Sequence, residues 1–352
     1  MNTPHRLCPR PFEWFEIHAD GSVFLCCPAW LKRPAGNLLT RSVEQIWNGP
    51  VAIELRKTIL NGSFHNCSRR HCPHFKRAGG LVAPFEDLAP GPAREALAAG
   101  KSLLDFPPQK INLCFDPRCN LSCPSCRCGQ SRLAPAEAAR VDRIAAMVRE
   151  ALLPRAAEVT LSGFGDPFAA PGYRALLAWI SPDTCPSLRA VRLHSNGQLF
   201  TAEAWHKLPG LHGLVREVEI SVDAACADTY VRNRPGGDFQ RLLDNLEFIA
   251  RLDARLTLSM VVQENNVDEM IGLAELARKL NARCYFSRLV NWGTFSTEDY
   301  RRRAIHLPAH PYHQRLRVNL VKLAGLTDVD PGNLTDLIEP DQSSGSKTSL
   351  PM

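Results

Sequence analysis

The sequence lacks long hydrophobic runs and a leader-like beginning. No apolar stretch reaches the roughly 18 residues that a membrane-spanning helix needs. The first ten residues lack the apolar core of a secretion signal. We therefore expect a cytoplasmic protein with no membrane partner. In that reducing compartment, cysteines do not build a disulfide framework.

A strong charge of either sign is also missing. The 352 residues are 45% hydrophobic and 22% charged, with a formal net charge of +6 at pH 7. These values are typical of a soluble chain long enough for two or more domains. The short basic runs at residues 69–70 and 301–303 have no aromatic residues interleaved with them, so nucleic acid is not an expected partner.

Cysteine, in contrast, is plentiful and unevenly placed. Five of the thirteen cysteines precede residue 75, and five more lie between residues 114 and 128. Clustered cysteines in a reducing compartment indicate metal binding rather than disulfides.

Most of the chain alternates between strand-like and helix-like segments. The expected strands are Lys110–Phe115, Glu158–Leu161, Ala190–His194, Val215–Val222, Arg255–Val262 and Arg283–Leu289. The expected helices between them are Pro135–Leu152, Tyr173–Ile180, Ala202–Leu208, Phe239–Leu252 and Val267–Leu280. This alternation predicts an α/β fold with a parallel sheet. Six strands are too few for a closed eight-stranded barrel, so we expect a partial (β/α)6 TIM-type barrel.

A small cysteine-rich α+β module precedes this region. Phe12 to Leu25 is expected to form a hairpin around the turn 19–21, followed by a helix capped by Ser42 and a helix at Pro50–Leu60. The predicted boundaries are 1–78 for the module, 79–108 for a proline-containing linker and 109–290 for the barrel. An extension at 291–341 and a disordered tail at 342–352 complete the chain.

The loop after the first barrel strand carries Cys119, Cys123 and Cys126 at C-x3-C-x2-C spacing. Three thiolates can hold three irons of a 4Fe–4S cluster and leave the fourth iron open to a cofactor or substrate. The alternative is a four-ligand zinc site completed by Cys128 or Cys114. Cys114 follows the strand pattern and is expected to be a buried residue, whereas Cys128 remains a rival ligand.

This loop resembles the cluster motif of the radical S-adenosylmethionine (SAM) superfamily, and the likeness continues over residues 109 to about 290. The segment 161–167 resembles the family's Gly-Gly-Glu-Pro segment, with Phe164 in place of the first Gly and Asp166 in place of the Glu. The ends of the third, fourth and fifth strands match in family order. The resemblance implies a set of SAM-binding positions: Gly163, Phe164, Gly165, Asp166, Asn196, Ser221, Arg234 and Val262.

The N-terminal cysteines resemble the SPASM-type auxiliary iron–sulfur module, which usually follows the barrel but here precedes it. The implied ligands are Cys8, Cys26, Cys67 and Cys72, with Cys27 as a rival to Cys26. A zinc knuckle built from the same four cysteines is the alternative. Such an auxiliary cluster can accept an electron from a substrate radical, bind the substrate if one of its irons is open, or stabilise a module that has a small core.

The resemblance implies a radical SAM enzyme with two 4Fe–4S clusters and SAM as cofactor. It would generate a 5′-deoxyadenosyl radical that abstracts hydrogen from a peptide side chain, or from a small molecule or sugar, with oxidation assisted by the auxiliary cluster. The expected electron donor is a low-potential flavodoxin or ferredoxin. The competing hypothesis is a non-catalytic zinc- or cluster-binding interaction protein on a degenerate barrel.

Overall fold

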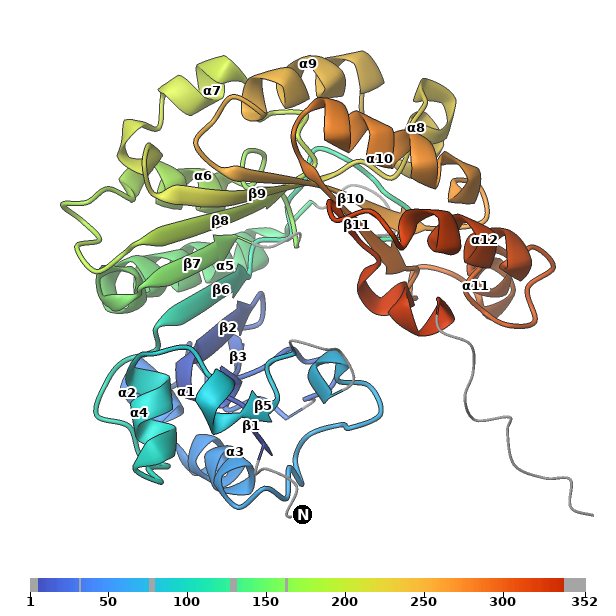
Figure 1. The fold of residues 1–352 in the computed structure, drawn as a ribbon. Helices are drawn as coiled ribbons and strands as arrows, with labels where there is room; N and C mark the ends of the chain where they lie inside the picture. Colours follow the sequence, from blue (N-terminus) through green and yellow to red (C-terminus); the bar gives the residue numbers. More distant parts are fainter. Residues whose placement is uncertain (1–5, 32, 76–79, 127–131, 162–163, 339–352) are drawn as a thin grey trace, which may run out of the picture. The chain divides into compact units, whose positions relative to one another are not determined.

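A computed structural model describes residues 6–31, 33–75, 80–126, 132–161 and 164–338 (Figure 1). Within these ranges, no helix combines the length and the apolar character required to cross a membrane. The chain divides into two compact units. The first contains residues 1–120, 130–219 and 251–255, and the second contains residues 121–129, 220–250 and 256–352.

The sheet of the first unit has the strand order β4-β3-β2-β6-β7-β8. Its strands are β2 (Trp14–His18), β3 (Ser22–Phe24), β4 (Gly36–Asn37), β6 (Lys110–Cys114), β7 (Glu158–Leu161) and β8 (Ala190–Ser195). Strands β2 and β3 form the predicted hairpin, with Glu16 opposite Phe24. The short strands β1 (Arg6–Leu7) and β5 (Ala83–Pro84) form a separate antiparallel pair.

Strand β2 of the N-terminal module pairs in parallel with β6, the first strand of the predicted barrel. The register places Glu16 opposite Asn112 and His18 opposite Cys114. The module's hairpin and the barrel strands β6, β7 and β8 therefore belong to one continuous sheet. This long-range pairing brings the first cysteine-rich segment into the same unit as the strand that leads to the second.

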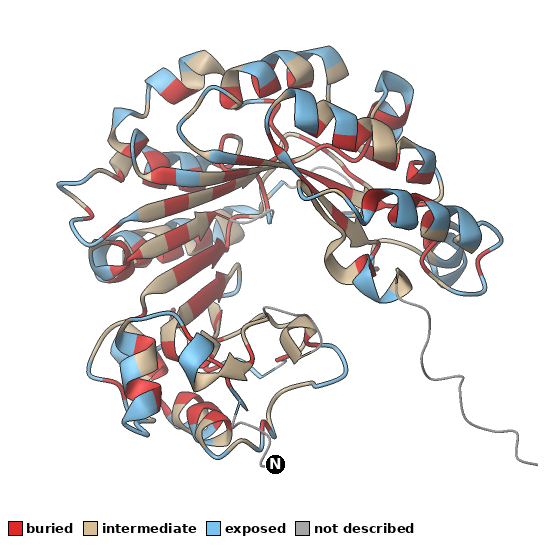
Figure 2. Ribbon diagram, in the orientation of Figure 1, coloured by how far each residue is buried: buried red, intermediate tan, exposed pale blue. Residues whose placement is uncertain are grey.

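The two faces of this sheet differ in chemistry. One face carries Phe15, Ile111, Val159 and Val191, which lie opposite one another in register and are almost fully buried. The other face carries Glu16, Asn112, Thr160 and Arg192 in the next row. Figure 2 shows the resulting alternation of buried and intermediate residues along β7 and β8. Burial of each large apolar side chain contributes about 1.5–3 kcal/mol, so the apolar face forms the core of the sheet.

The helices of the first unit are α1 (Arg10–Glu13), α2 (Val43–Trp47), α3 (Pro50–Leu60), α4 (Pro92–Ala98), α5 (Pro135–Met147), α6 (Pro171–Trp179) and α7 (Ala202–His206). Ser42 caps α2 in a complete capping box with Gln45, as the sequence predicts. A π-helical turn, Val148–Leu152, continues α5. Helix α4 lies within the segment predicted as a linker.

The second unit contains the end of β9 (Val215–Ser221), and β10 (Arg255–Val262), β11 (Arg283–Arg288) and β12 (Val329–Asp330). Strands β10, β11 and β12 are parallel neighbours. The helices are α8 (Ala227–Asn233), α9 (Phe239–Ile249), α10 (Met270–Lys279), α11 (Thr297–Arg303) and α12 (His313–Leu323).

All six predicted barrel strands, β6 to β11, form within one or two residues of the expected positions. Strands β4 and β12 end the strand order, so the parallel sheet of the described chain is open rather than a closed barrel. The α/β fold class and the partial barrel are therefore confirmed. The predicted disordered tail falls outside the described residues.

Candidate metal centres

The loop that follows β6 is fixed at its start by Asp116, whose side chain is fully buried. One carboxylate oxygen accepts hydrogen bonds from the backbone N–H and Nε of Arg118, and the other accepts from the Arg118 guanidinium and from Gly172 N–H. The backbone N–H of Asp116 donates to the Tyr173 hydroxyl, which itself donates to the Leu113 carbonyl. These contacts fix the position of the backbone immediately before Cys119, the first cysteine of the loop.

Cys119 lies beside the end of β8 in the first unit. The side-chain amide of Asn196 donates to the Cys119 sulfur at 3.5 Å and to the Asn120 side-chain oxygen at 2.9 Å. N–H donors stabilise a thiolate over a thiol, and hydrogen bonds to cluster sulfurs tune their potential. Asn196, predicted as a SAM-binding residue, thus contacts a loop cysteine.

Cys123 and Cys126 belong to the second unit. A tight turn joins them, in which Cys126 N–H donates to the Cys123 carbonyl at 3.0 Å. The Ser122 N–H donates to the Pro235 carbonyl, and the Arg234 guanidinium contacts the Cys123 sulfur at 3.8 Å. Cys123 is buried, whereas Cys126 is exposed. Cys128 lies outside the described residues, so its role remains a prediction.

Arg234 is held by a buried ion pair with Asp223, at 2.7 Å. Burial alone would lower the pKa of this guanidinium, but the charges of Asp223 and then of Cys123 raise it above its ordinary value. Asp223 adopts a left-handed backbone conformation with φ of 60°, and its other carboxylate oxygen accepts from Val261 N–H at 2.7 Å. The ion pair thereby holds the positive charge of Arg234 beside the sulfur of Cys123.

Asp166 uses all of its carboxylate for internal hydrogen bonds. One oxygen accepts from the N–H groups of Phe168 and Ala169. The other accepts from the Ser195 hydroxyl at 2.8 Å and from Asn196 N–H at 2.9 Å. The side chain is 1% exposed. It joins the loop after β7 to the end of β8, so a SAM contact at this position would use the main chain.

Gly165 allows this loop to approach the cysteine loop closely. Its φ is 84°, and a Cβ atom there would lie 2.0 Å from the Asp116 carbonyl oxygen. Phe164 is 42% exposed. Ser221 ends β9, and the buried Val262 ends β10. Gly163 lies outside the described residues. The SAM-binding assignment of these positions stays a prediction.

The four predicted auxiliary cysteines converge in the first unit. Burial raises the pKa of Cys8, and the charges of Cys26 and Cys67 raise it further. Burial, with Cys26 and Cys72 nearby, raises the pKa of Cys67 to about 12. Cys8 and Cys72 are buried, and the described cysteines form no disulfide. Cys26 and Cys67 are partly buried. A bound cation would favour the thiolate form of all four residues.

Cys26 and Cys27 have different surroundings. The Trp30 indole N–H donates to the Cys26 sulfur at 3.1 Å, and Cys26 interacts electrostatically with the other three cysteines. Burial raises the pKa of Cys27 to about 11, and the charge of Glu16 contributes to that shift. These contacts favour Cys26 over Cys27 as the fourth ligand.

A cavity of about 550 Å³ lies at the edge of the same module. Cys67 lines it together with Trp30, Arg33 and His71. One predicted cluster ligand therefore faces open space.

Sequence reasoning did not single out Asp116 and Asp223, although each positions a functional loop. Asp116 lies three residues before Cys119, and Asp223 lies within a segment that the family resemblance already covered. Neither residue has a pattern that distinguishes it from an ordinary loop aspartate. Their roles depend on contacts with residues that are distant in sequence.

The fold and these sites define an α/β protein with two thiol-rich metal centres. Two family models match the chain. An iron–sulfur cluster-binding domain model (SPASM) matches residues 8–73, and a radical SAM superfamily model matches residues 114–277. Residues 114–277 thus match the radical SAM superfamily, and the segment that matches the SPASM domain lies on the N-terminal side of that match.

A curated relative is similar to part of the chain. It is an AdoMet-dependent heme synthase from Methanosarcina barkeri, 30% identical over 169 residues. The match covers 47% of this chain and 46% of the relative, so the chain spans about half the length of that protein.

Solved structures with a related fold were also found. SuiB from Streptococcus suis, bound to S-adenosylmethionine, matches with a TM-score of 0.41 and 16% identity, covering 80% of this chain and 61% of SuiB. Native anSMEcpe with bound AdoMet matches with a TM-score of 0.40 and 14% identity, covering 61% of each chain.

The two domains imply an iron–sulfur cluster in each, with SAM as the cofactor of the second. The donor sets fit these groups. The N-terminal module offers four converging thiols, whereas the loop offers three cysteines with an amide donor at Cys119 and a guanidinium at Cys123. Two 4Fe–4S clusters are consistent with both sets.

Proposed function

We propose that this enzyme reductively cleaves SAM and uses the resulting 5′-deoxyadenosyl radical to abstract hydrogen from its substrate. The observation that carries the proposal is the three-cysteine loop. The sulfurs of Cys119 and Cys123 have N–H donors, and a set of three ligands would leave one iron of a bound cluster open to SAM.

The residues of the chain hold the cysteine loop and its neighbouring loops in position and supply charge; they are not proposed as acid–base catalysts. In the first unit, Asp116 and Asp166 fix the loops that follow β6 and β7; in the second unit, Asp223 holds the Arg234 guanidinium. A fixed positive charge suits the SAM carboxylate or the thiolate-bound cluster. Because these groups are already hydrogen-bonded, little reorganisation is needed when the cofactor binds.

The auxiliary module has a distinct proposed role. Four cysteine ligands would saturate its cluster, so it would accept an electron from the substrate radical rather than bind the substrate. The overall reaction would then be a two-electron oxidation. Electrons for SAM cleavage would come from a low-potential flavodoxin or ferredoxin.

The substrate is proposed to be a small molecule rather than a peptide side chain. The curated relative is named as a heme synthase, which favours a heme precursor as the first substrate to test. The polar face of the first unit's sheet, with Arg192 paired to both Glu158 and Glu217, offers charged groups to such a molecule.

The test is SAM cleavage by the full chain, purified and reconstituted without oxygen. The reconstituted chain should contain about eight irons, and it should form 5′-deoxyadenosine when dithionite and SAM are added. Zinc in place of iron, or no 5′-deoxyadenosine from a fully reconstituted protein, would contradict the proposal. Heme precursors and short peptides, added in parallel, would show which one is consumed.

A further inference from the structure

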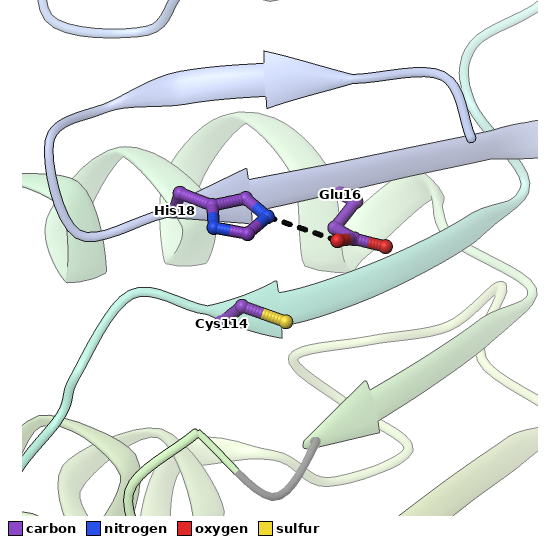
Figure 3. A group of neighbouring side chains, drawn as sticks. All are labelled: Glu16, His18 and Cys114. Carbon is purple, nitrogen blue, oxygen red and sulfur yellow. Dashed lines mark hydrogen bonds and ion pairs between the residues drawn. The ribbon is translucent and has the colours of Figure 1, made fainter. Parts of the chain in front are cut away.

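A third group of metal-ligand side chains lies on the polar face of the first unit's sheet. Glu16 and His18 on β2 and Cys114 on β6 point toward one another (Figure 3). Their ligand atoms all lie within 4.8 Å of one another. Neither of the two predicted cluster ligand sets includes these residues; Cys114 was considered only as a fourth ligand of the alternative zinc site in the loop.

The sheet register produces this group. His18 lies opposite Cys114 in the parallel ladder, and Glu16 lies opposite Asn112. Residues two apart on a strand share a face, so both strands direct these side chains to the same side. Glu16 is 5% exposed and Cys114 is 7% exposed, while His18 is half-buried and gives access from solvent.

Neighbouring residues orient the ligand atoms. The Trp14 indole N–H and the Asn112 amide both donate to Oε2 of Glu16, at 3.2 and 3.0 Å. This leaves Oε1 facing Nε2 of His18 at 2.9 Å. The His18 ring packs edge-on against Phe24, with centroids 5.2 Å apart. Such outer contacts are typical of metal sites, where they fix the direction of each ligand.

Asn112 adds an independent observation. Its amide nitrogen also contacts the Cys114 sulfur at 3.4 Å, and the residue is 8% exposed. Its side-chain oxygen is buried and has no hydrogen-bond partner among the described residues. A buried polar atom without a partner is costly. Water bound to a metal ion beside Asn112 would supply the missing donor.

We propose that Glu16, His18 and Cys114 bind a divalent transition metal ion of the zinc type. Carboxylate oxygen, imidazole nitrogen and thiolate sulfur are the ligands that zinc takes in proteins. Binding displaces the thiol proton of Cys114 to solvent, and the thiolate and carboxylate then balance the two positive charges of the ion. Three protein ligands leave a fourth position for water or a substrate oxygen.

The separations are compatible with this ion. Ligand atoms around tetrahedral zinc lie about 3.3–3.8 Å apart, given bond lengths of about 2.0–2.3 Å. The ligand atoms of the group all lie within 4.8 Å of one another, so none needs to approach another by more than about 1.5 Å, and the 2.9 Å Glu16–His18 contact opens by about 0.4 Å.

The test measures zinc in the cluster-reconstituted full chain after equilibration with zinc and removal of excess metal. We expect one zinc ion per chain, with an X-ray absorption spectrum at the zinc edge that shows one sulfur and otherwise nitrogen or oxygen ligands. Cys114→Ser and His18→Gln should each weaken zinc binding at least about 100-fold, given that loss of outer contacts alone costs 10- to 100-fold.

Cys185→Ser is the matched control, because it removes a buried thiol of the same unit far from the group in sequence. It should bind zinc like the wild type. His18→Gln changes a half-buried residue, so it keeps the test decisive if Cys114→Ser fails to fold. A four-sulfur zinc spectrum, zinc binding unchanged in both variants, or no bound zinc would overturn the proposal. The assay involves no SAM cleavage, so its outcome is separate from that of the proposed function.

Discussion

The four cysteines of the N-terminal module and the three of the loop after β6 differ in number and surroundings. In the module, burial raises the pKa of Cys8, Cys26, Cys67 and Cys72, and the charges of neighbouring cysteines raise the pKa of the first three further. In the loop, Cys119 faces an amide donor and Cys123 faces a guanidinium. The first set has four cysteines, enough to saturate a 4Fe–4S cluster, whereas the predicted loop set has three cysteines, one of which lies beside a fixed positive charge.

This difference assigns the two centres to different tasks. A saturated cluster can pass electrons and hold a small module together. An unsaturated cluster in polar surroundings can bind a cofactor directly. Four variants test this contrast.

The largest effect should follow replacement of Cys119, Cys123 and Cys126 by Ala. We expect 5′-deoxyadenosine formation to disappear, because the cofactor loses its iron, and the iron content to fall from about eight to about four per chain. Iron analysis and product chromatography measure both. If the variant still cleaved SAM at the wild-type rate, SAM would have to bind at the other cluster.

Replacement of Cys8, Cys26, Cys67 and Cys72 by Ala should have the complementary result. About four irons should remain, and 5′-deoxyadenosine should still form at a reduced rate, while oxidised substrate should not accumulate. Cys185→Ala serves as a control for thiol loss. An unchanged iron content would refute the auxiliary assignment.

Arg234→Leu removes the positive charge beside Cys123 and leaves Asp223 buried without its ion-pair partner. Breaking a buried pair in this way costs about 3–5 kcal/mol of the free energy of unfolding. The matched control is Arg33→Leu, which removes one half of an exposed pair with Glu54 and should cost about 0–1 kcal/mol. Urea unfolding measures both changes. Equal losses would show that the Asp223–Arg234 pair has no special role.

Asp166→Asn should have the smallest effect of the four. An amide cannot accept from all four donors that the carboxylate now satisfies, so we expect a loss of about 2 kcal/mol in stability. SAM cleavage should also fall, because Ser195 and Asn196 lose their anchor. The exposed Asp183→Asn is the control. Unaltered stability and cleavage would mean that the carboxylate is dispensable.

The strands could be predicted from the sequence because their apolar runs are short and bounded by turn residues. Strands β7 and β10 have the expected limits, and the capping box at Ser42 forms as expected. The pairing of β2 with β6 could not be predicted, since no local pattern links residues that are 96 positions apart. Helices α8 and α11 were likewise missed: both are only seven residues long.

The sequence could single out the cysteines as ligands because their spacing is itself the signal, and their role as ligands stays a prediction. The supporting residues could not be singled out in this way, because their roles arise from tertiary contacts. Cys114 illustrates the limit: its burial was expected from the strand pattern, but its place beside Glu16 and His18 depends on a strand from another segment. Asp166 was predicted to lie in the SAM-binding segment, but the hydrogen bonds of its carboxylate to Ser195 and Asn196 at the end of β8 could not be read from the sequence.

The most direct test of the contrast between the two centres is electron paramagnetic resonance of the reduced protein with and without SAM. In the variant that lacks Cys8, Cys26, Cys67 and Cys72, the signal of the remaining cluster should shift when SAM is added. In the variant that lacks Cys119, Cys123 and Cys126, it should not. A SAM-dependent shift in the second variant, or none in the first, would contradict the assignment of the open site to the loop after β6.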